Sequence, residues 1–448
     1  MSQLMISISG IRGVVGTGLT PEVTLSFAQA FGTYCKGGKI VVGRDSRVSG
    51  VMLQEAISSG LLAVGCDVID VGVAPTPTIQ LATEKLHSTG GVILTASHNP
   101  VMWNGMKLLA PDGLFLDSEQ FAEVVNIRER CTYELKSWDR LGALSTYNSA
   151  VDDHLNAVTA LNFINVEQIR RRKFRVVVDC VNGAGGVIVP KLLKHLGCEV
   201  VPLNIEPTGR FSHDPEPLPE NLSQLGQAVR EHHADFGLAV DPDSDRLALV
   251  SEKGVALGEE YTLAIAIDYL LRIKKGKVVV NVSTSLVIDD IAAKYGCSVE
   301  RTRVGEIYVA KRMREIDAVI GGEGNGGVIL PNIHLGRDAI VGIAMTLQYL
   351  VEFGGSLSEL HASFPKYVMC KRKVELNGGI DARNILDRIA KKYQREKMDL
   401  QDGIKILRDK SWMQIRASNT EPIFRIMTEA PTLSMAEELC QELEAVVQ

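Results

Sequence analysis

The sequence predicts an α/β fold: three related α/β domains with mixed sheets, followed by a smaller α+β domain. The first observation is length, because a chain of 448 residues is longer than a domain with a single hydrophobic core usually is. The second is a coarse repeat, in which residues 39–47, 174–186 and 277–285 each read as a basic lead-in, a β-branched run and a polar turn. A helical stretch follows each copy, and the succession of strand, turn and helix is the signature of βαβ units. Three copies therefore predict three related domains.

Breaks in this repeat give the expected domain boundaries. The stretch at 126–140 mixes charged and apolar residues without a core pattern, so the first domain should end near residue 150. The last segment differs from the repeat, because an alternating stretch at 367–376 precedes a closing amphipathic helix near 433–446. This pattern is typical of a small α+β module, which we expect to rotate as a lid. The predicted domains are residues 1–150, 151–253, 254–365 and 366–448.

The composition indicates a soluble protein and excludes several functional classes. Apolar residues make up 45% and charged residues 23%, and the net charge of −6 offers no broad basic surface for nucleic acid. The eight cysteines include no C-x-x-C pair, which favours reduced thiols and a cytoplasmic location. The first residues lack a signal-peptide pattern. Since no apolar run approaches the roughly 20 residues that span a bilayer, we expect no membrane partner.

The first candidate site is a polar turn after an apolar strand. Val92, Ile93 and Leu94 favour a strand, and Pro100 cannot continue its ladder. The turn between them places Ser97 at the carboxyl end of the strand, where open α/β sheets bind ligands. Ser97 is therefore either a nucleophile or a serine whose hydroxyl stabilises the turn by a hydrogen bond to its own backbone.

The second candidate site is an acidic turn between two apolar strands. Asp241, Asp243 and Asp245 alternate within five residues, and like charges at 4 Å repel by about 4 kcal/mol at an effective dielectric constant of about 20. A cation would remove this cost, and oxygen ligands suit Mg²⁺ or Ca²⁺. An EF-hand is excluded, because Arg246 stands where that loop needs glycine and the flanks are strands. A solvated acidic turn is the remaining alternative.

Two later loops carry groups that suit a phosphorylated sugar. Residues 416–425 contain two arginines, two hydroxyls and an amide, a set suited to binding an anion. Residues 321–327 form a glycine-rich turn on which Glu323 and Asn325 are the hydrogen-bonding side chains, and sugar hydroxyls suit such a pair. Taken singly, each loop is also compatible with an ordinary turn.

Together these loops resemble those of the α-D-phosphohexomutase superfamily, which includes phosphoglucomutase, phosphomannomutase and phosphoglucosamine mutase. The motifs stand in the order of the family and span essentially the whole chain. The matching segments are TASHNP (95–100) with NGMK (104–107) for the phosphoserine loop, DPDSDR (241–246) for the metal loop, GEGNGG (322–327) for the sugar loop, RASNTEP (416–422) for the phosphate loop, and GIRG (10–13) and GRDSR (43–47) for two further active-site segments.

The resemblance implies three α/β domains and a smaller fourth around a central cleft. It also implies an enzyme that interconverts hexose 6-phosphate and hexose 1-phosphate through a phosphoserine and a 1,6-bisphosphate intermediate. Ser97 would carry the phosphoryl group, and hexose 1,6-bisphosphate would act as activator. One Mg²⁺ per chain would be held by Ser97, Asp241, Asp243 and Asp245.

The resemblance further assigns residues to catalysis and to substrate binding. We expect Lys107 to act as general acid/base, His98 to position the reacting groups, and Arg12 to supply positive charge, although Lys107 could also be a surface lysine. The expected substrate-binding residues are Arg246, Glu323, Asn325, Arg416, Ser418, Asn419, Thr420 and Arg425.

The sugar loop bears on the choice of substrate. Many bacterial phosphoglucosamine mutases have GE-x-SGH there, whereas this chain has Asn325 and Gly327 in place of the serine and the histidine. We expect glucosamine phosphate as the substrate, with phosphomannomutase or phosphoglucomutase activity as the alternative. A non-catalytic phosphosugar-binding protein and a phosphatase are further alternatives. The protein should be a monomer or a homodimer.

Overall fold

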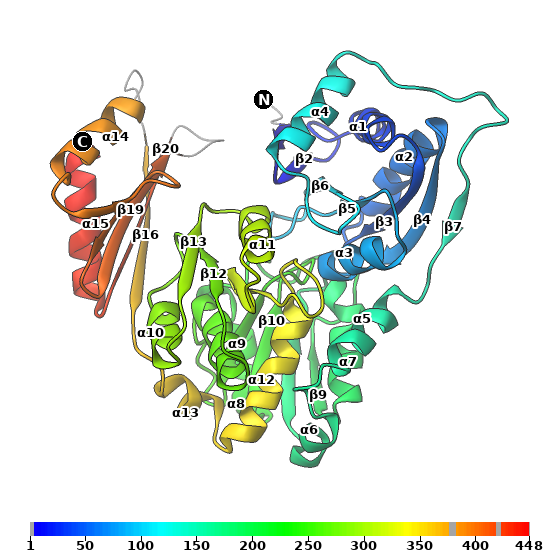
Figure 1. Cartoon of the computed structure of the whole chain (residues 1–448). Coiled ribbons are helices and arrows are strands. Elements are labelled where there is room, and N and C mark those ends of the chain that lie inside the picture. Colours follow the sequence, from blue (N-terminus) through cyan, green and yellow to red (C-terminus); the bar gives the residue numbers. More distant parts are fainter. Residues whose placement is uncertain (1–3, 376–381, 418–422, 448) are drawn as a thin grey trace. The chain divides into compact units, whose positions relative to one another are not determined.

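The computed structural model describes residues 4–375, 382–417 and 423–447 (Figure 1). The chain divides into two compact units. The first comprises Met1–Ala266 and Asn325–His361, and the second comprises Ile267–Gly324 and Ala362–Gln448. Residues 254–365, which the sequence suggests as one domain, therefore contribute to both units.

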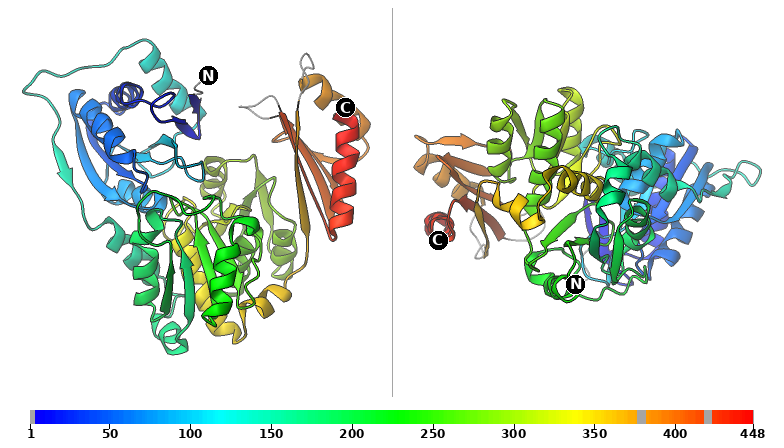
Figure 2. Two further views of the ribbon diagram at one scale, coloured as in Figure 1. Left: turned by 180° about the vertical axis from the view of Figure 1, so that it is seen from behind. Right: turned by 90° about the horizontal axis from the view of Figure 1, so that it is seen from below.

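The N-terminal part of the first unit is a mixed sheet with helices on both faces (Figure 2). Its elements are β1 (Met5–Ser7), β2 (Gly10–Val14), α1 (Pro21–Tyr34), β3 (Gly38–Arg44), α2 (Gly50–Ala63), β4 (Cys66–Val73), α3 (Thr76–Lys85), β5 (Gly90–Leu94), β6 (Trp103–Leu109), α4 (Ser118–Glu129) and β7 (Leu144–Thr146). The strand order is β1-β2-β6-β5-β3-β4-β7. Along β3, Ile40 and Val42 pack into one apolar cluster and Val41 into another, because successive side chains point to opposite faces. The continuous apolar runs of the sequence follow from burial on both faces.

A second mixed sheet, also in the first unit, presents the acidic turn. Its elements are α5 (Ala150–Thr159), α6 (Val166–Arg172), β8 (Arg175–Asp179), a 3₁₀ turn (Ala184–Val187), α7 (Val189–His195), β9 (Glu199–Leu203), a 3₁₀ turn (Pro219–Asn221), α8 (Ser223–Glu231), β10 (Phe236–Val240) and β11 (Leu247–Ser251). The strand order is β11-β10-β8-β9. β10 runs parallel to β8 and antiparallel to β11, so residues 241–246 connect two buried neighbouring strands.

Further elements complete the first unit and begin the second. They are α9 (Glu259–Ile273), β12 (Val278–Asn281), α10 (Val287–Lys294), β13 (Val299–Thr302), α11 (Glu306–Glu315), β14 (Ile320–Glu323), β15 (Gly327–Ile329), α12 (Ala339–Phe353) and α13 (Leu357–Ala362). β12 pairs in parallel with β13 and β14, as expected for a third βαβ region. α12 is apolar on all sides and nearly all of it is buried.

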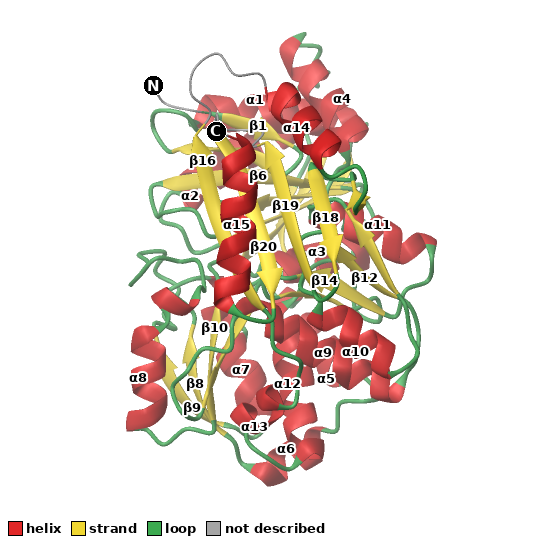
Figure 3. Cartoon of the chain, turned by 90° about the vertical axis from the view of Figure 1, so that its left-hand side faces the viewer, coloured by secondary structure: helices red, strands yellow, loops and turns green. Residues whose placement is uncertain are grey.

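The carboxy-terminal part of the second unit is an antiparallel sheet covered by helices. Its elements are β16 (Val368–Glu375), α14 (Ala382–Lys392), β17 (Lys397–Asp399), β18 (Ile404–Arg408), β19 (Ser411–Ala417), β20 (Ile423–Ala430) and α15 (Leu433–Val447). The strand order is β16-β20-β19-β18-β17, and α15 lies across one face (Figure 3). Three α/β regions and a smaller α+β region confirm the predicted fold class. Across the described residues, the helices lack the combined length and apolar character that crossing a bilayer requires.

Buried polar contacts bind this sheet to the segment after β12 within the second unit. Lys405 donates from Nζ to the carbonyl oxygen of Val282, and burial lowers the pKa of this lysine. Glu429 Oε2 accepts hydrogen bonds from Trp412 Nε1 at 2.6 Å and from the backbone nitrogen of Leu286 at 2.9 Å. The hypothesis that the last domain rotates as a lid therefore requires that these contacts break or that the segment after β12 moves with the domain.

Candidate active site

Ser97 lies in the turn between the antiparallel strands β5 and β6. Its backbone has a φ of 48°, a left-handed conformation that residues other than glycine adopt infrequently. The residue is 3% exposed, so the strained turn holds a largely buried hydroxyl. Ser97 Oγ donates to Asp241 Oδ2 at 3.0 Å and lies 3.3 Å from His98 Nδ1. The structure thus brings the predicted nucleophile directly against the acidic turn.

The three aspartates of the acidic turn are fully buried, with carboxylate oxygens that lie within 4.8 Å of one another. Asp243 Oδ2 accepts from Lys107 Nζ at 2.9 Å and from Thr76 Oγ1 at 2.7 Å. Asp241 Oδ1 accepts from the backbone nitrogen of Arg246 at 3.1 Å. The burial of all three side chains excludes the alternative of a solvated acidic turn.

The electrostatics of this cluster indicate an unmet need for positive charge. Burial, Asp245 and Asp243 together raise the pKa of Asp241 well above its usual value. Burial also opposes ionisation of Asp243, but Lys107 and the hydrogen bonds from Asp241 and Thr76 together outweigh burial and lower the pKa of that carboxyl. Among the described residues, Asp243 Oδ1 and Asp245 Oδ1 are buried without a hydrogen-bond partner. Buried carboxylate oxygens of this kind fit a divalent cation that prefers oxygen ligands, so the aspartates can hold a metal ion.

Cationic and imidazole side chains surround the aspartates. Lys107, on β6, is 4% exposed and is therefore not a surface lysine. Arg246 donates from Nη1 to Glu216 Oε1 at 3.0 Å, and Arg12 Nη1 donates to the Asn99 side chain at 3.3 Å. Burial, together with Arg246 and Arg12, lowers the pKa of His98 to about 2, which makes its imidazole neutral. All four predicted catalytic residues thus belong to the first unit.

The expected sugar- and phosphate-binding residues are divided between the units. In the second unit, Glu323 ends β14, and its Oε1 accepts from Asn281 Nδ2 at 2.8 Å and from the backbone nitrogen of Gly305 at 3.1 Å. Asn325 belongs to the first unit, where its buried Oδ1 has no hydrogen-bond partner within the part of the chain that is described. Ser418, Asn419 and Thr420 lie outside the described residues.

Arg416 and Arg425 form a pair on the C-terminal sheet. They stand directly opposite each other on β19 and β20. Burial lowers the pKa of Arg416, with Arg425 acting in the same direction and Asp402 and Glu323 opposing it. Like charges opposite each other in a sheet are unfavourable, and an anion between them removes that cost. The register therefore brings together two of the residues expected to hold a phosphate.

Sequence reasoning missed Arg337, which belongs to the charge cluster. Its Nη2 lies 2.5 Å from Asp245 Oδ2, and the side chain is 10% exposed. Arg337 directly precedes Asp338, whose carboxylate caps α12 through the backbone nitrogens of Ile340 and Val341. An aspartate before an apolar run is a recognisable cap signal, but it does not reveal what the preceding arginine contacts.

A second cluster, formed by His154, His334 and Asp338, is explained by hydrogen bonding. Asp338 Oδ2 lies 2.8 Å from His154 Nε2 and 3.1 Å from His334 Nε2. The backbone nitrogen of Gly336 donates to His334 Nδ1 at 3.0 Å, so Nε2 is the ring nitrogen that donates to Asp338. Through these contacts the cluster anchors the loop that carries Arg337.

Comparison with known proteins covers the chain from end to end. Family models described as Phosphoglucomutase/phosphomannomutase match alpha/beta/alpha domains I, II and III at residues 5–134, 152–254 and 258–367, and the C-terminal domain at residues 371–446. A phosphoglucomutase/phosphomannomutase of Thermococcus kodakarensis is 42% identical over 438 residues, covering 96% of this chain and 95% of that protein. A probable phosphoglucosamine mutase of Methanopyrus kandleri is 40% identical over 452 residues, covering 98% and 96% respectively.

Solved structures agree with these matches. The crystal structure of a phosphoglucomutase/phosphomannomutase family protein from Burkholderia thailandensis superposes with a TM-score of 0.86 at 26% identity, covering 99% of this chain and 98% of that one. The four family matches, the sequence relatives and the shared fold lead to one conclusion. The chain belongs to the phosphoglucomutase/phosphomannomutase family and is a phosphohexomutase, an intramolecular phosphotransferase.

Proposed function

We propose that this phosphohexomutase interconverts glucosamine 6-phosphate and glucosamine 1-phosphate, with Ser97 as the phosphoryl carrier. The observation that supports this role is the contact of Ser97 Oγ with Asp241 at 3.0 Å, in a buried turn beside carboxylate oxygens that lack protein partners among the described residues. Oxygen ligands and a serine hydroxyl at one point are the groups that metal-assisted phosphoryl transfer needs.

In the proposed reaction, the phosphoryl group of Ser97 passes to the free hydroxyl of the bound hexosamine phosphate. The bond between phosphorus and Ser97 Oγ breaks as a bond from phosphorus to the sugar oxygen forms. Lys107 Nζ gives a proton to Ser97 Oγ, and the proton of the attacking hydroxyl replaces it on Lys107. The resulting 1,6-bisphosphate turns over, and Ser97 Oγ takes back the other phosphoryl group in the reverse sequence of bond changes. Free hexose 1,6-bisphosphate would act as activator by phosphorylating Ser97.

The aspartates are proposed to hold one Mg²⁺ per chain. Asp241, Asp243 and Asp245 would hold it together with the Ser97 side chain, and the unpaired Oδ1 atoms of Asp243 and Asp245 support this ligand set within the described residues. When bound, the ion neutralises negative charge on the transferring oxygens. His98 and Arg12 would position the loop and the phosphate, because Ser97 Oγ lies 3.3 Å from His98 and Arg12 contacts Asn99.

The remaining predicted residues are proposed to bind the substrate. Glu323 and Asn325 would bind sugar hydroxyls in both orientations of the substrate, and Arg246 would contact the reacting phosphate. The cross-strand pair of Arg416 and Arg425 supports a site for the phosphate that is not reacting. Ser418, Asn419 and Thr420 would complete that site.

The proposal includes the division of the chain into the four domains that the sequence predicts. The four domains would be residues 1–150, 151–253, 254–365 and 366–448, each carrying one of the four loops that resemble those of the family. All eight cysteines are free thiols, which supports a cytoplasmic location. A monomer or a homodimer would suffice, since every proposed residue comes from one chain.

Phosphomannomutase or phosphoglucomutase activity is the second candidate. The relative at 42% identity carries the name phosphoglucomutase/phosphomannomutase, whereas relatives at 40% and 38% are named probable phosphoglucosamine mutases. Glucosamine differs from glucose in the substituent at C2, and mannose differs from glucose in the configuration at C2. A comparison of kcat/KM for glucosamine, glucose and mannose phosphates decides between them, and a higher value for glucose or mannose phosphate would overturn the glucosamine assignment.

Product analysis tests the reaction type. Glucosamine 6-phosphate, Mg²⁺ and a trace of bisphosphate should give glucosamine 1-phosphate, visible as a new ³¹P signal with no inorganic phosphate released. A phosphatase would release inorganic phosphate, and a binding protein would leave the substrate unchanged. Either of those results contradicts the proposal.

A further inference from the structure

Arg47 lies behind the turn that carries Ser97 and is fully buried. Arginine has five N–H groups, and here each one donates a hydrogen bond. Nε donates to Asp45 Oδ2 at 3.0 Å, Nη1 to the carbonyl oxygens of Pro100 and Trp103 at 2.9 Å each, and Nη2 to the carbonyl oxygens of Ser97 at 2.6 Å and Asn99 at 2.7 Å. The guanidinium therefore holds the backbone of the whole turn.

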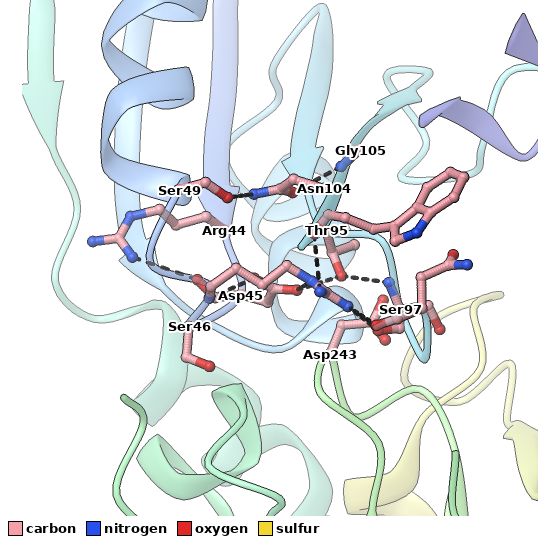
Figure 4. Close-up of polar contacts among 12 residues, drawn as sticks. Arg44, Asp45, Ser46, Ser49, Thr95, Ser97, Asn104, Gly105 and Asp243 are labelled. Carbon is pink, nitrogen blue, oxygen red and sulfur yellow. Dashed lines mark hydrogen bonds and ion pairs between the residues drawn. The ribbon is translucent and has the colours of Figure 1, made fainter. Parts of the chain in front are cut away.

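Asp45 extends the same contacts to the other side of Ser97. Its Oδ1 accepts from the backbone nitrogen of Arg47 at 2.8 Å, and its Oδ2 accepts from Thr95 Oγ1 at 2.7 Å. Thr95 Oγ1 in turn accepts from the backbone nitrogen of Ser97 at 2.9 Å (Figure 4). The backbone N–H of Ser97 is thus fixed through Thr95, and its carbonyl through Arg47.

A positive φ at a serine persists only where the surroundings determine the backbone from both sides. The contacts of Thr95 and Arg47 fix the two peptide groups that flank Ser97, and the left-handed φ of 48° follows from them. That conformation aims Oγ at Asp241. A small rotation of either peptide group would move Oγ away from the carboxylate.

A segment of the second sheet region seals Arg47 from solvent. The Phe211 ring lies over the guanidinium, with 4.8 Å between the ring centroid and Cζ. Ser46 Oγ donates to the carbonyl oxygen of Asn182 at 2.7 Å. At Gly209, which has a φ of +67°, a Cβ would come within 2.0 Å of the Ser46 carbonyl oxygen, so the two segments are in close backbone contact. A phosphate therefore has neither a path to this guanidinium nor a free N–H to bind.

We propose that Asp45, Arg47 and Thr95 are positioning residues for phosphoryl transfer: they act through the backbone of Ser97 and do not contact the phosphate. An arginine beside a phosphoserine would ordinarily be taken for a phosphate ligand. Here its charge is matched by Asp45, and its donors are used by carbonyl oxygens. This inference rests on the proposed role of Ser97 as phosphoryl carrier.

The test uses the full-length protein and two substitutions of different severity. Thr95→Val keeps the shape of the side chain and removes both hydrogen bonds, and Arg47→Lys keeps the charge and removes the planar fork. We expect kcat to fall about tenfold for Thr95→Val and about 100-fold for Arg47→Lys, because small misplacements of reacting groups cost about that much. KM for the hexose phosphate should not change, and Thr95→Ser should recover most of the lost rate.

Two measurements separate positioning from loss of folded protein. The rates are expressed per phosphorylated active site, counted by intact mass, and the ³¹P signal of the phosphoserine should shift or broaden in Thr95→Val. Arg128→Lys is the matched control, because the Arg128 guanidinium also lies over an aromatic ring, that of Phe27, and donates from Nε to Ser26 Oγ at 2.9 Å, but belongs to no active-site segment; its kcat should equal that of the wild type.

The outcomes distinguish this inference from the proposed function. If Ser97→Ala is inactive while folded Thr95→Val and Arg47→Lys turn over at the wild-type rate, the positioning role is wrong and the phosphoserine role stands. A rise in KM with unchanged kcat in Arg47→Lys would make Arg47 a substrate ligand, which also overturns the inference. Activity in Ser97→Ala would overturn the proposed function itself.

Discussion

Ser97 Oγ and Asp241 Oδ2 lie 3.0 Å apart although 144 positions separate the two residues in the chain. Each belongs to a turn between antiparallel neighbouring strands, Ser97 after β5 and Asp241 after β10. Both turns contain a residue other than glycine with a left-handed backbone, Ser97 at φ 48° and Ser244 at φ 55°. Two strained turns that meet at one buried point indicate a site built for chemistry, because strain of this kind clusters at functional sites.

Removal of the divalent cation should abolish activity, and Mg²⁺ should restore it. Asp243→Ala should be inactive even at high Mg²⁺, because it removes one ligand and the partner of Lys107 at 2.9 Å. Calorimetry measures the binding directly: we expect the wild type to bind one Mg²⁺ and Asp243→Ala to bind much more weakly. An enzyme that keeps its full rate in EDTA would show that the aspartates hold no essential metal.

Arg337→Met should destabilise the metal-free protein, because Asp245 would lose its nearest cationic partner among the described residues, at 2.5 Å, and keep Lys107 and Arg246 at 4.0 and 3.9 Å. Breaking a buried ion pair costs about 3–5 kcal/mol. Added Mg²⁺ should return much of this loss by neutralising the carboxylate. The measurement is Tm in EDTA and in Mg²⁺ for the wild type, Arg337→Met and Arg337→Lys, with the lysine variant intermediate. Equal Tm values for wild type and Arg337→Met in EDTA would count against the ion pair.

Arg425→Ala should weaken binding of both the 1-phosphate and the 6-phosphate substrate, since each orientation presents one phosphate to the arginine pair. A charge-assisted hydrogen bond contributes about 1.5–3 kcal/mol, or roughly 10- to 150-fold in KM. More bisphosphate should also escape during turnover. Arg372→Ala is the control, because Arg372 pairs with Glu444 of α15 on the opposite face of the sheet. Unchanged KM and unchanged escape would make the pair a structural feature only.

His213 should make stability fall as the pH rises through neutrality. Its Nε2 lies 2.9 Å from Asp179 Oδ2 and its Nδ1 lies 2.8 Å from the Asp214 carbonyl oxygen, so both nitrogens have an acceptor. The bond to Asp179 raises the pKa of His213. A raised folded-state pKa stabilises the protein below the unfolded pKa of about 6.5, and the gain is lost as the pH rises through the folded value. His213→Gln should therefore reduce the difference in Tm between about pH 6 and about pH 8, and an unchanged difference would contradict this assignment.

The sequence could predict the parts of the site that lie on short apolar strands. Ser97 and the three aspartates each follow a strand that is buried on both faces, and such runs are readable without a structure. The burial of Lys107 could not be read in the same way, because its segment NGMK contains no apolar run. Its position follows from the pairing of Lys107 with Ile93 across β6 and β5.

The contacts that support the site could not be predicted from the sequence, because they join residues that lie far apart in the chain. Arg337 reaches Asp245 across 92 positions, and Arg47 reaches Ser97 across 50. Neither contact follows from periodicity, because the Arg47 contact depends on the order of strands and the Arg337 contact depends on where α12 begins. Arg416 and Arg425 stand opposite each other only because β19 pairs with β20, and the sequence does not reveal that pairing.

The phosphoryl group on Ser97 is the central claim, and peptide mass spectrometry tests it most directly. The enzyme is incubated with hexose 1,6-bisphosphate, quenched and digested, and the peptide containing Ser97 is compared before and after addition of excess hexose monophosphate in a single turnover. We predict that Ser97 carries one phosphoryl group, that the group appears in the bisphosphate product at a rate no slower than kcat, and that Ser97→Ala carries none and is inactive. Normal turnover by Ser97→Ala, or a phosphoryl group on Ser97 that the substrate never removes, would contradict the account.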